Sequence, residues 1–99
     1  MFKQMTIIAP GLLGGSLGLA VKKRKIARKV VVWARRIESA QAAVKRKAAD
    51  RYEADLSDAV KGSDLVVICS PVEAMPSLAR QFRRSLGKDA IVTDVGSVK

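Results

Sequence analysis

A run of glycines near the start of the chain is the pattern with the clearest chemical meaning. The apolar residues 5–8 stop at Pro10 and Gly11, and Gly14 follows in a segment with apolar residues at helical spacing. A strand, a glycine turn and a helix start in this order form a cradle for the pyrophosphate of a dinucleotide. The unpaired N–H groups and the dipole of the helix start attract the anion. One position departs from the motif, because Ala9 stands where G-x-G-x-x-G has its first glycine.

Two arginines occur where the strand after the glycine segment is expected to end. A cofactor without a 2′-phosphate usually meets an acidic residue about twenty positions after the glycines, and in this chain that position is Ala34. Arg35 and Arg36 come next, and a guanidinium can hold a phosphate with two parallel hydrogen bonds. The pattern favours NADP over NAD. The alternative is that both arginines are solvated cations at a helix start, where positive charge is mildly unfavourable.

Both motifs depend on strands and helices that alternate along the chain. Apolar runs rich in β-branched residues predict strands, and apolar residues at helical spacing predict the helices between them. The expected strands cover residues 3–8, 29–34, 50–53, 64–69 and 90–94. The expected helices cover residues 13–24, 37–47, 55–60 and about 76–86. Asp55 is expected to cap the third helix, and Gly62 is expected to stop it.

This alternation predicts an α/β fold with parallel strands and right-handed crossovers. We expect one domain over residues 1–99, with a Rossmann-type doubly wound sheet of five strands in the order 3-2-1-4-5. In such a sheet a ligand lies at the carboxyl ends of strands one and four, where the order reverses. The loops at residues 9–11 and 70–72 meet there. The glycine motif and the topology therefore predict the same crevice.

Composition limits the class of protein further. The 99 residues are 48% hydrophobic, enough for a core, and their net charge of +10 favours anionic partners unless it is only a solvated surface. No apolar run is long enough to span a bilayer, and residues 1–4 do not begin a signal peptide. The single cysteine, Cys69, excludes an internal disulfide and fits a reducing, cytoplasmic location. The chain has no histidine, which is the commonest general base.

Three segments together resemble one family. Residues 11–17, 69–72 and 93–99 read GLLGGSL, CSPV and TDVGSVK, and they are similar to the cofactor domain of prephenate/arogenate dehydrogenases. These enzymes are oxidoreductases of tyrosine biosynthesis, in which a hydride passes from the substrate ring to the nicotinamide. The glycine segment fits many dehydrogenases, whereas the closing DVGSVK is much more specific. The resemblance covers the whole chain but only the front part of such an enzyme.

The resemblance implies a role for each matching residue. The pyrophosphate would be held by Gly11, Leu12, Leu13 and Gly14, and the adenosine ribose would lie by Arg35 and Arg36. The cofactor crevice would be lined by Ser70, Pro71 and Val72, and an auxiliary residue at the substrate end would be Ser97. The family's catalytic histidine, substrate-binding arginine and helical dimerisation domain follow the point where this chain stops. The resemblance therefore implies cofactor binding without turnover.

Three positions depart from the family pattern. Ala9 replaces the turn glycine, and Lys25 and Lys47 stand at helix ends that usually carry a left-handed glycine. Histidine and asparagine are also absent, so these features indicate an excised domain that has been engineered or simplified. Without the helical domain, strand five is expected to be an open edge and apolar surface to be uncovered. This suggests self-association by pairing of that edge, by swapping of an element or through the uncovered surface.

Two other functions stay open from the sequence. The domain binds its cofactor weakly or not at all if the methyl group of Ala9 distorts the turn. The basic stretches at residues 22–29 and 45–51 could instead bind nucleic acid, but the four aromatic residues are not interleaved with these charges, which disfavours that function. No metal site and no membrane partner are expected.

Overall fold

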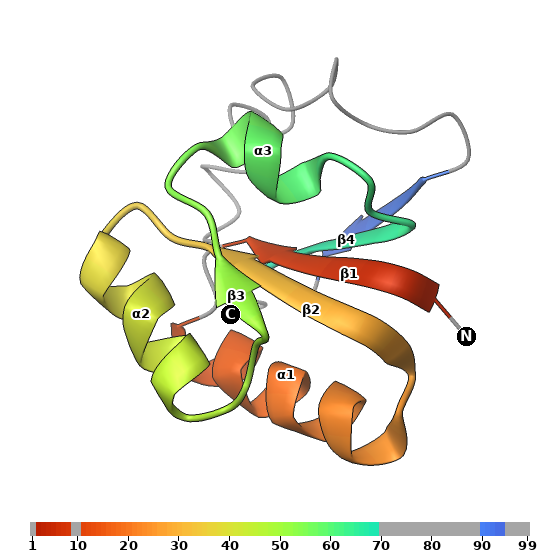
Figure 1. Cartoon of the computed structure of the whole chain (residues 1–99), viewed down its shortest axis with the longest axis horizontal. Coiled ribbons are helices and arrows are strands. Elements are labelled where there is room, and N and C mark those ends of the chain that lie inside the picture. Colours follow the sequence, from red (N-terminus) through yellow and green to blue (C-terminus); the bar gives the residue numbers. More distant parts are fainter. Residues whose placement is uncertain (1, 9–10, 70–89, 95–99) are drawn as a thin grey trace.

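A parallel β-sheet forms the centre of the structure, a computed structural model that describes residues 2–8, 11–69 and 90–94. Its strands are β1 (Phe2–Ile8), β2 (Ala27–Trp33), β3 (Arg51–Tyr52), β4 (Leu65–Ile68) and β5 (Ile91–Asp94) (Figure 1). They lie in the order β3-β2-β1-β4-β5, and every pair is parallel. The predicted α/β class and strand order are therefore confirmed.

Strand β1 lies in the middle of the sheet, and it pairs with β2 along one side and with β4 along the other. Residues 5–8 are all buried, as expected for a parallel strand that is covered on both faces. The polar member of this run is Thr6, whose hydroxyl donates a hydrogen bond to the Ala59 carbonyl oxygen at 2.7 Å. It is also hydrogen-bonded to the hydroxyl of Ser63. Its polar atom is thus satisfied inside the core.

Helices cover both faces of the sheet (Figure 1). α1 (Gly11–Arg24) and α2 (Ile37–Lys45) lie on one face, and the short α3 (Leu56–Val60) lies on the other. Asp55 caps α3 as predicted, because its carboxylate accepts hydrogen bonds from the amides of Ser57 at 2.8 Å and Asp58 at 3.2 Å. Gly62 follows the helix with φ of +83°, so the predicted stop is a left-handed glycine.

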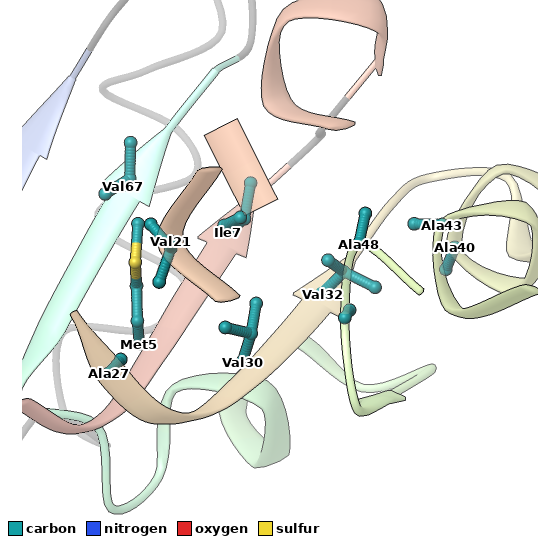
Figure 2. Packing of buried hydrophobic residues seen from close by; sticks show 11 residues of the cluster. Met5, Ile7, Val21, Ala27, Val30, Val32, Ala40, Ala43, Ala48 and Val67 are labelled. Carbon is teal, nitrogen blue, oxygen red and sulfur yellow. The ribbon is translucent and has the colours of Figure 1, made fainter. Parts of the chain in front are cut away.

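Within the described ranges, the buried residues form two apolar clusters that share the sheet. Successive strand residues point to opposite faces, so neighbours along one strand belong to different clusters. Figure 2 shows the cluster under α1 and α2, which includes Met5, Ile7, Val21, Val30, Val32, Ala40, Ala43 and Val67. The cluster under α3 consists of Ile8, Val31, Trp33, Leu56, Ala59, Val60, Val66 and Ile68.

The predicted boundaries within the described residues all lie within two residues of the observed ones. The difference that matters most is at α1, which begins at Gly11 and not at Leu13. The second half of the glycine motif is therefore already the first turn of the helix, and two residues separate it from β1. The helix expected over residues 76–86 lies outside the described residues.

Two lysines adopt the left-handed backbone conformation at helix ends. Lys25 follows α1 with φ of +55°, and Lys47 follows the C-cap residue of α2 with φ of +66°. At the first end, the Lys25 amide bonds the Lys22 carbonyl and the Ile26 amide bonds the Val21 carbonyl. This pair of hydrogen bonds defines a Schellman motif, whose left-handed position strongly prefers glycine. The expectation that lysine replaces a helix-ending glycine is confirmed at both positions.

We predict that Lys25→Gly and Lys47→Gly each stabilise the fold. A left-handed conformation costs a residue with a β-carbon about 1–2 kcal/mol, and the greater backbone entropy of unfolded glycine offsets part of that gain. The expected net rise in the free energy of unfolding is about 0.5–1 kcal/mol per substitution, to be measured by urea denaturation.

Lys23→Gly is the matched control, because Lys23 is exposed inside the last turn of α1. Glycine there should lower the free energy of unfolding by about 1 kcal/mol. Equal losses in all three variants would show that the left-handed lysines are unstrained.

Candidate functional site

The carboxyl ends of β1 and β4 form the point where the strand order reverses. Ile8 and Ile68 are register partners at this edge, and both are buried. The Cys69 amide donates to the Ile8 carbonyl oxygen at 2.9 Å, which keeps the two strand ends together. Ligands of doubly wound sheets bind outside this kind of switch point. The described residues therefore provide the floor of the predicted crevice.

Helix α1 begins directly beyond this edge. β1 ends at Ile8, and α1 starts at Gly11. The first turn of α1 contains no acidic residue, and its last turn contains Lys22, Lys23 and Arg24. The start of the helix therefore has free N–H groups and the positive end of the dipole, with no carboxylate in that turn to repel an anion. This arrangement fits the pyrophosphate of a dinucleotide.

A close backbone contact fixes the position of α1. Gly18 is buried against the chain after α2, and a β-carbon at this position would overlap the carbonyl oxygen of Ala48. Gly18 was not assigned a role from the sequence. The signal available was its spacing, because Gly14 and Gly18 are four residues apart and occupy one side of the helix.

A second contact holds the far end of the same helix. The ammonium group of Lys22 pairs with the carboxylate of Asp50, which also accepts the Val30 amide at 2.7 Å. Partial burial raises the pKa of Asp50, but the hydrogen bonds from Lys22 and Val30 and the nearby positive charges outweigh it, so the pKa is lowered below its usual value. The charged carboxylate thus ties α1 to β2 at neutral pH.

The two predicted arginines lie at the carboxyl end of β2. Arg35 and Arg36 are exposed, and Arg36 is the N-cap residue of α2 with an extended backbone and no capping side-chain bond. Ile8 is the register partner of Trp33, so the arginines follow the strand that adjoins the β1–α1 connection. Within residues 2–8, 11–69 and 90–94, the ion pairs are Lys22–Asp50 and Arg51–Glu53, and neither involves these arginines.

The acidic residues that follow β3 are engaged in local contacts. Glu53 pairs with Arg51, and Asp55 caps α3. The indole N–H of Trp33 donates to the Ala54 carbonyl oxygen at 3.1 Å, which joins the end of β2 to the approach to α3. These contacts engage Glu53 and Asp55, whereas Arg35, Arg36 and the exposed Glu38 in the first turn of α2 carry the remaining charges near the end of β2.

Cys69 is half-buried at the end of β4. Burial raises the pKa of its thiol to about 11, so the thiol is protonated at neutral pH and is a poor nucleophile. Ala9, Ser70, Pro71, Val72 and Ser97 lie outside the described residues. Among the residues that are described, no helix is long and apolar enough to cross a membrane. The same part of the chain contains no cluster of metal-ligating side chains.

The sequence and the fold both match those of a known protein family. Residues 17–99 match the family model of the prephenate dehydrogenase nucleotide-binding domain. The chain belongs to this family. The matched span begins after Gly11 and Gly14, so the family model does not cover the glycine segment.

Several relatives of this prephenate dehydrogenase domain have established activities or structures. The chain is 35% identical over 99 residues to the cyclohexadienyl dehydrogenase of Zymomonas mobilis and covers 34% of that protein. It superposes on the crystal structure of prephenate dehydrogenase from A. aeolicus, in complex with hydroxyphenyl propionate and NAD+, with a TM-score of 0.89 and 27% identity, over 100% of this chain and 35% of that one. Synechocystis arogenate dehydrogenase matches with a TM-score of 0.87 and 27% identity, over 97% of this chain and 34% of that one. The chain thus spans about a third of the length of these relatives.

We predict that Gly18→Ala destabilises the fold by forcing α1 away from the chain after α2. The added methyl group meets backbone that cannot rotate away, so the overlap outweighs the better helix propensity of alanine. The free energy of unfolding should fall by about 2 kcal/mol, measured by urea denaturation.

Leu19→Ala is the control in the same turn, because 48% of the Leu19 surface is exposed. It should change stability by only about 0.5 kcal/mol. If the two variants are equally stable, the contact between α1 and Ala48 does not constrain the helix.

Proposed function

We propose that this chain is the NADP(H)-binding domain of a prephenate or arogenate dehydrogenase and forms one domain over residues 1–99. Family membership supports a nucleotide-binding role, and the exposed arginines at the end of β2 support the choice of NADP. Arg35 and Arg36 would hold the 2′-phosphate. Ala34, which precedes them, carries no charge that would repel a phosphate.

The remaining contacts follow from the fold. The first turn of α1, with Gly11, Leu12, Leu13 and Gly14, would bind the pyrophosphate through its backbone amides. The opposite wall of the crevice would be formed by Ser70, Pro71 and Val72 after β4, and the substrate end would include Ser97. When bound, the cofactor supplies a nicotinamide that accepts a hydride. The chain's own residues would bind and orient it beside the sheet edge.

We propose further that these 99 residues do not turn over substrate by themselves. They contain no histidine. The histidine that the family resemblance implies as general base is therefore not among these 99 residues. The chain would therefore contribute cofactor binding, and proton removal would occur elsewhere in a complete enzyme.

We predict that calorimetric titration shows tighter binding of NADP than of NAD. The preference should be about tenfold, because two guanidinium groups meet the extra phosphate at an exposed site. Arg35→Ala together with Arg36→Ala should abolish the preference and leave NAD affinity unchanged. Arg46→Ala, at the C-terminal end of α2, removes an exposed arginine away from this corner and should leave the preference intact.

Equal affinity for the two cofactors in the unmodified chain would contradict the assignment to NADP. Absence of binding would favour a different proposal, in which Ala9 weakens the turn. In that case Ala9→Gly should restore binding. If Ala9→Gly also fails to bind either cofactor, the domain has no dinucleotide site.

The outer edge of the sheet supports a further proposal, that two copies associate through β5. Among the described strands, β5 pairs only with β4, and Ile91 and Val92 are 53% and 41% exposed. An open apolar edge can pair with the same edge of another chain. Light scattering should show a dimer fraction that rises with concentration, and Val92→Lys should reduce it. A strict monomer at high concentration would count against edge pairing.

A further inference from the structure

A second group of cations lies at the amino ends of the strands, which we call the amino edge, opposite the carboxyl ends where the cofactor site is proposed. Residues 22–29 contain six cations and no acidic residue, and they join the end of α1 to the start of β2. β2 rises about 3.3 Å per residue, so Ala27 is about 20 Å from Trp33 at the carboxyl edge. An anion at this amino edge would therefore occupy a place separate from the dinucleotide (Figure 1).

Three of these cations line a pocket that we call the amino-edge pocket. It has a volume of about 330 Å³ and is lined by Lys22, Lys25, Ala27 and Arg28. Lys22 is paired with Asp50. Within the described part of the chain, Lys25 and Arg28 form no ion pair. The pocket thus combines a concave surface with at least two cations that no described carboxylate neutralises.

The dipole of α1 accounts for only part of this charge. The C-terminal end of a helix carries roughly half a negative charge, and it favours the cations of the last turn. Lys25 and Arg28 follow the helix, and Lys25 occupies a left-handed position that prefers glycine. The helix dipole therefore does not explain why both of these cations line the pocket.

We propose that the amino-edge pocket binds a small anion with several phosphate groups, independently of the dinucleotide. Arg28 can bind phosphate oxygens in a bidentate manner, and Lys25 supplies a point charge, whereas Lys22 lines the pocket but is paired with Asp50. A small polyphosphate is favoured over a nucleic-acid strand, because the described residues that line the pocket include no aromatic side chain to stack on a base. This site goes beyond the proposed cofactor function and does not require it.

The test is a titration of the 99-residue chain with inorganic tripolyphosphate at constant ionic strength, followed by amide chemical shifts in ¹H–¹⁵N spectra. Saturable shifts are expected at the amides of Ala27 and Arg28, which line the pocket. The matched variants are Lys25→Gly and Lys47→Gly. Each removes one charge and one left-handed lysine, but only Lys25 lines the pocket. We expect Lys25→Gly to weaken binding about fivefold and Lys47→Gly to change it by less than about twofold.

Both variants relieve backbone strain, so a loss of binding in Lys25→Gly cannot be attributed to unfolding. If both variants bind tripolyphosphate equally weakly, the loss of net charge alone explains the effect, and the proposal is wrong. Shifts confined to the amides around Arg35 and Gly11 would place the anion at the cofactor edge and also overturn it. If a single-stranded oligonucleotide binds more tightly than tripolyphosphate and its binding depends on Lys25, the ligand of the pocket is nucleic acid, and the proposal of a small anion is wrong.

Discussion

The burial of β1 on both faces and along both edges is the constraint on which the rest of the structure depends. Residues 5–8 have no contact with solvent, so neither a turn nor a charge can be placed among them. The chain can reverse only beyond Ile8, and α1 begins after two further residues. The free amides of that helix therefore face the carboxyl edge of the sheet because of how β1 is buried, before any ligand is considered.

The helix that carries the candidate site is held by contacts in its middle and at its C-terminal end. Gly18 contacts the Ala48 carbonyl, and Lys22 pairs with Asp50, so both contacts come from the chain between α2 and β3. Substitutions in that connection, which is remote from the proposed cofactor site, can therefore alter the position of the amides at the start of α1. The ion pair with Asp50 neutralises Lys22, and it leaves Lys25 and Arg28 at the amino edge without a described carboxylate partner.

The order and type of the described elements could be predicted from the sequence. The strands β1, β2 and β4 each contain consecutive apolar residues, which are typical of a parallel sheet covered on both faces. Schellman motifs at Lys25 and Lys47 could be predicted because they depend on local backbone geometry. The roles of Gly18 and Asp50 could not be predicted. Gly18 contacts a carbonyl thirty positions later in the chain and Asp50 binds Lys22, so these contacts exist only after α1 and α2 are packed side by side.

Trp33 gives the molecule a built-in optical reporter. It is the only tryptophan in the chain, it is buried in the cluster under α3, and its indole N–H is bonded to Ala54. Its emission therefore comes from one apolar environment and should shift to longer wavelength when that face of the sheet opens to water. Because Trp33 also lies two residues before Arg35, the same fluorescence signal originates close to the corner where a ribose phosphate would bind.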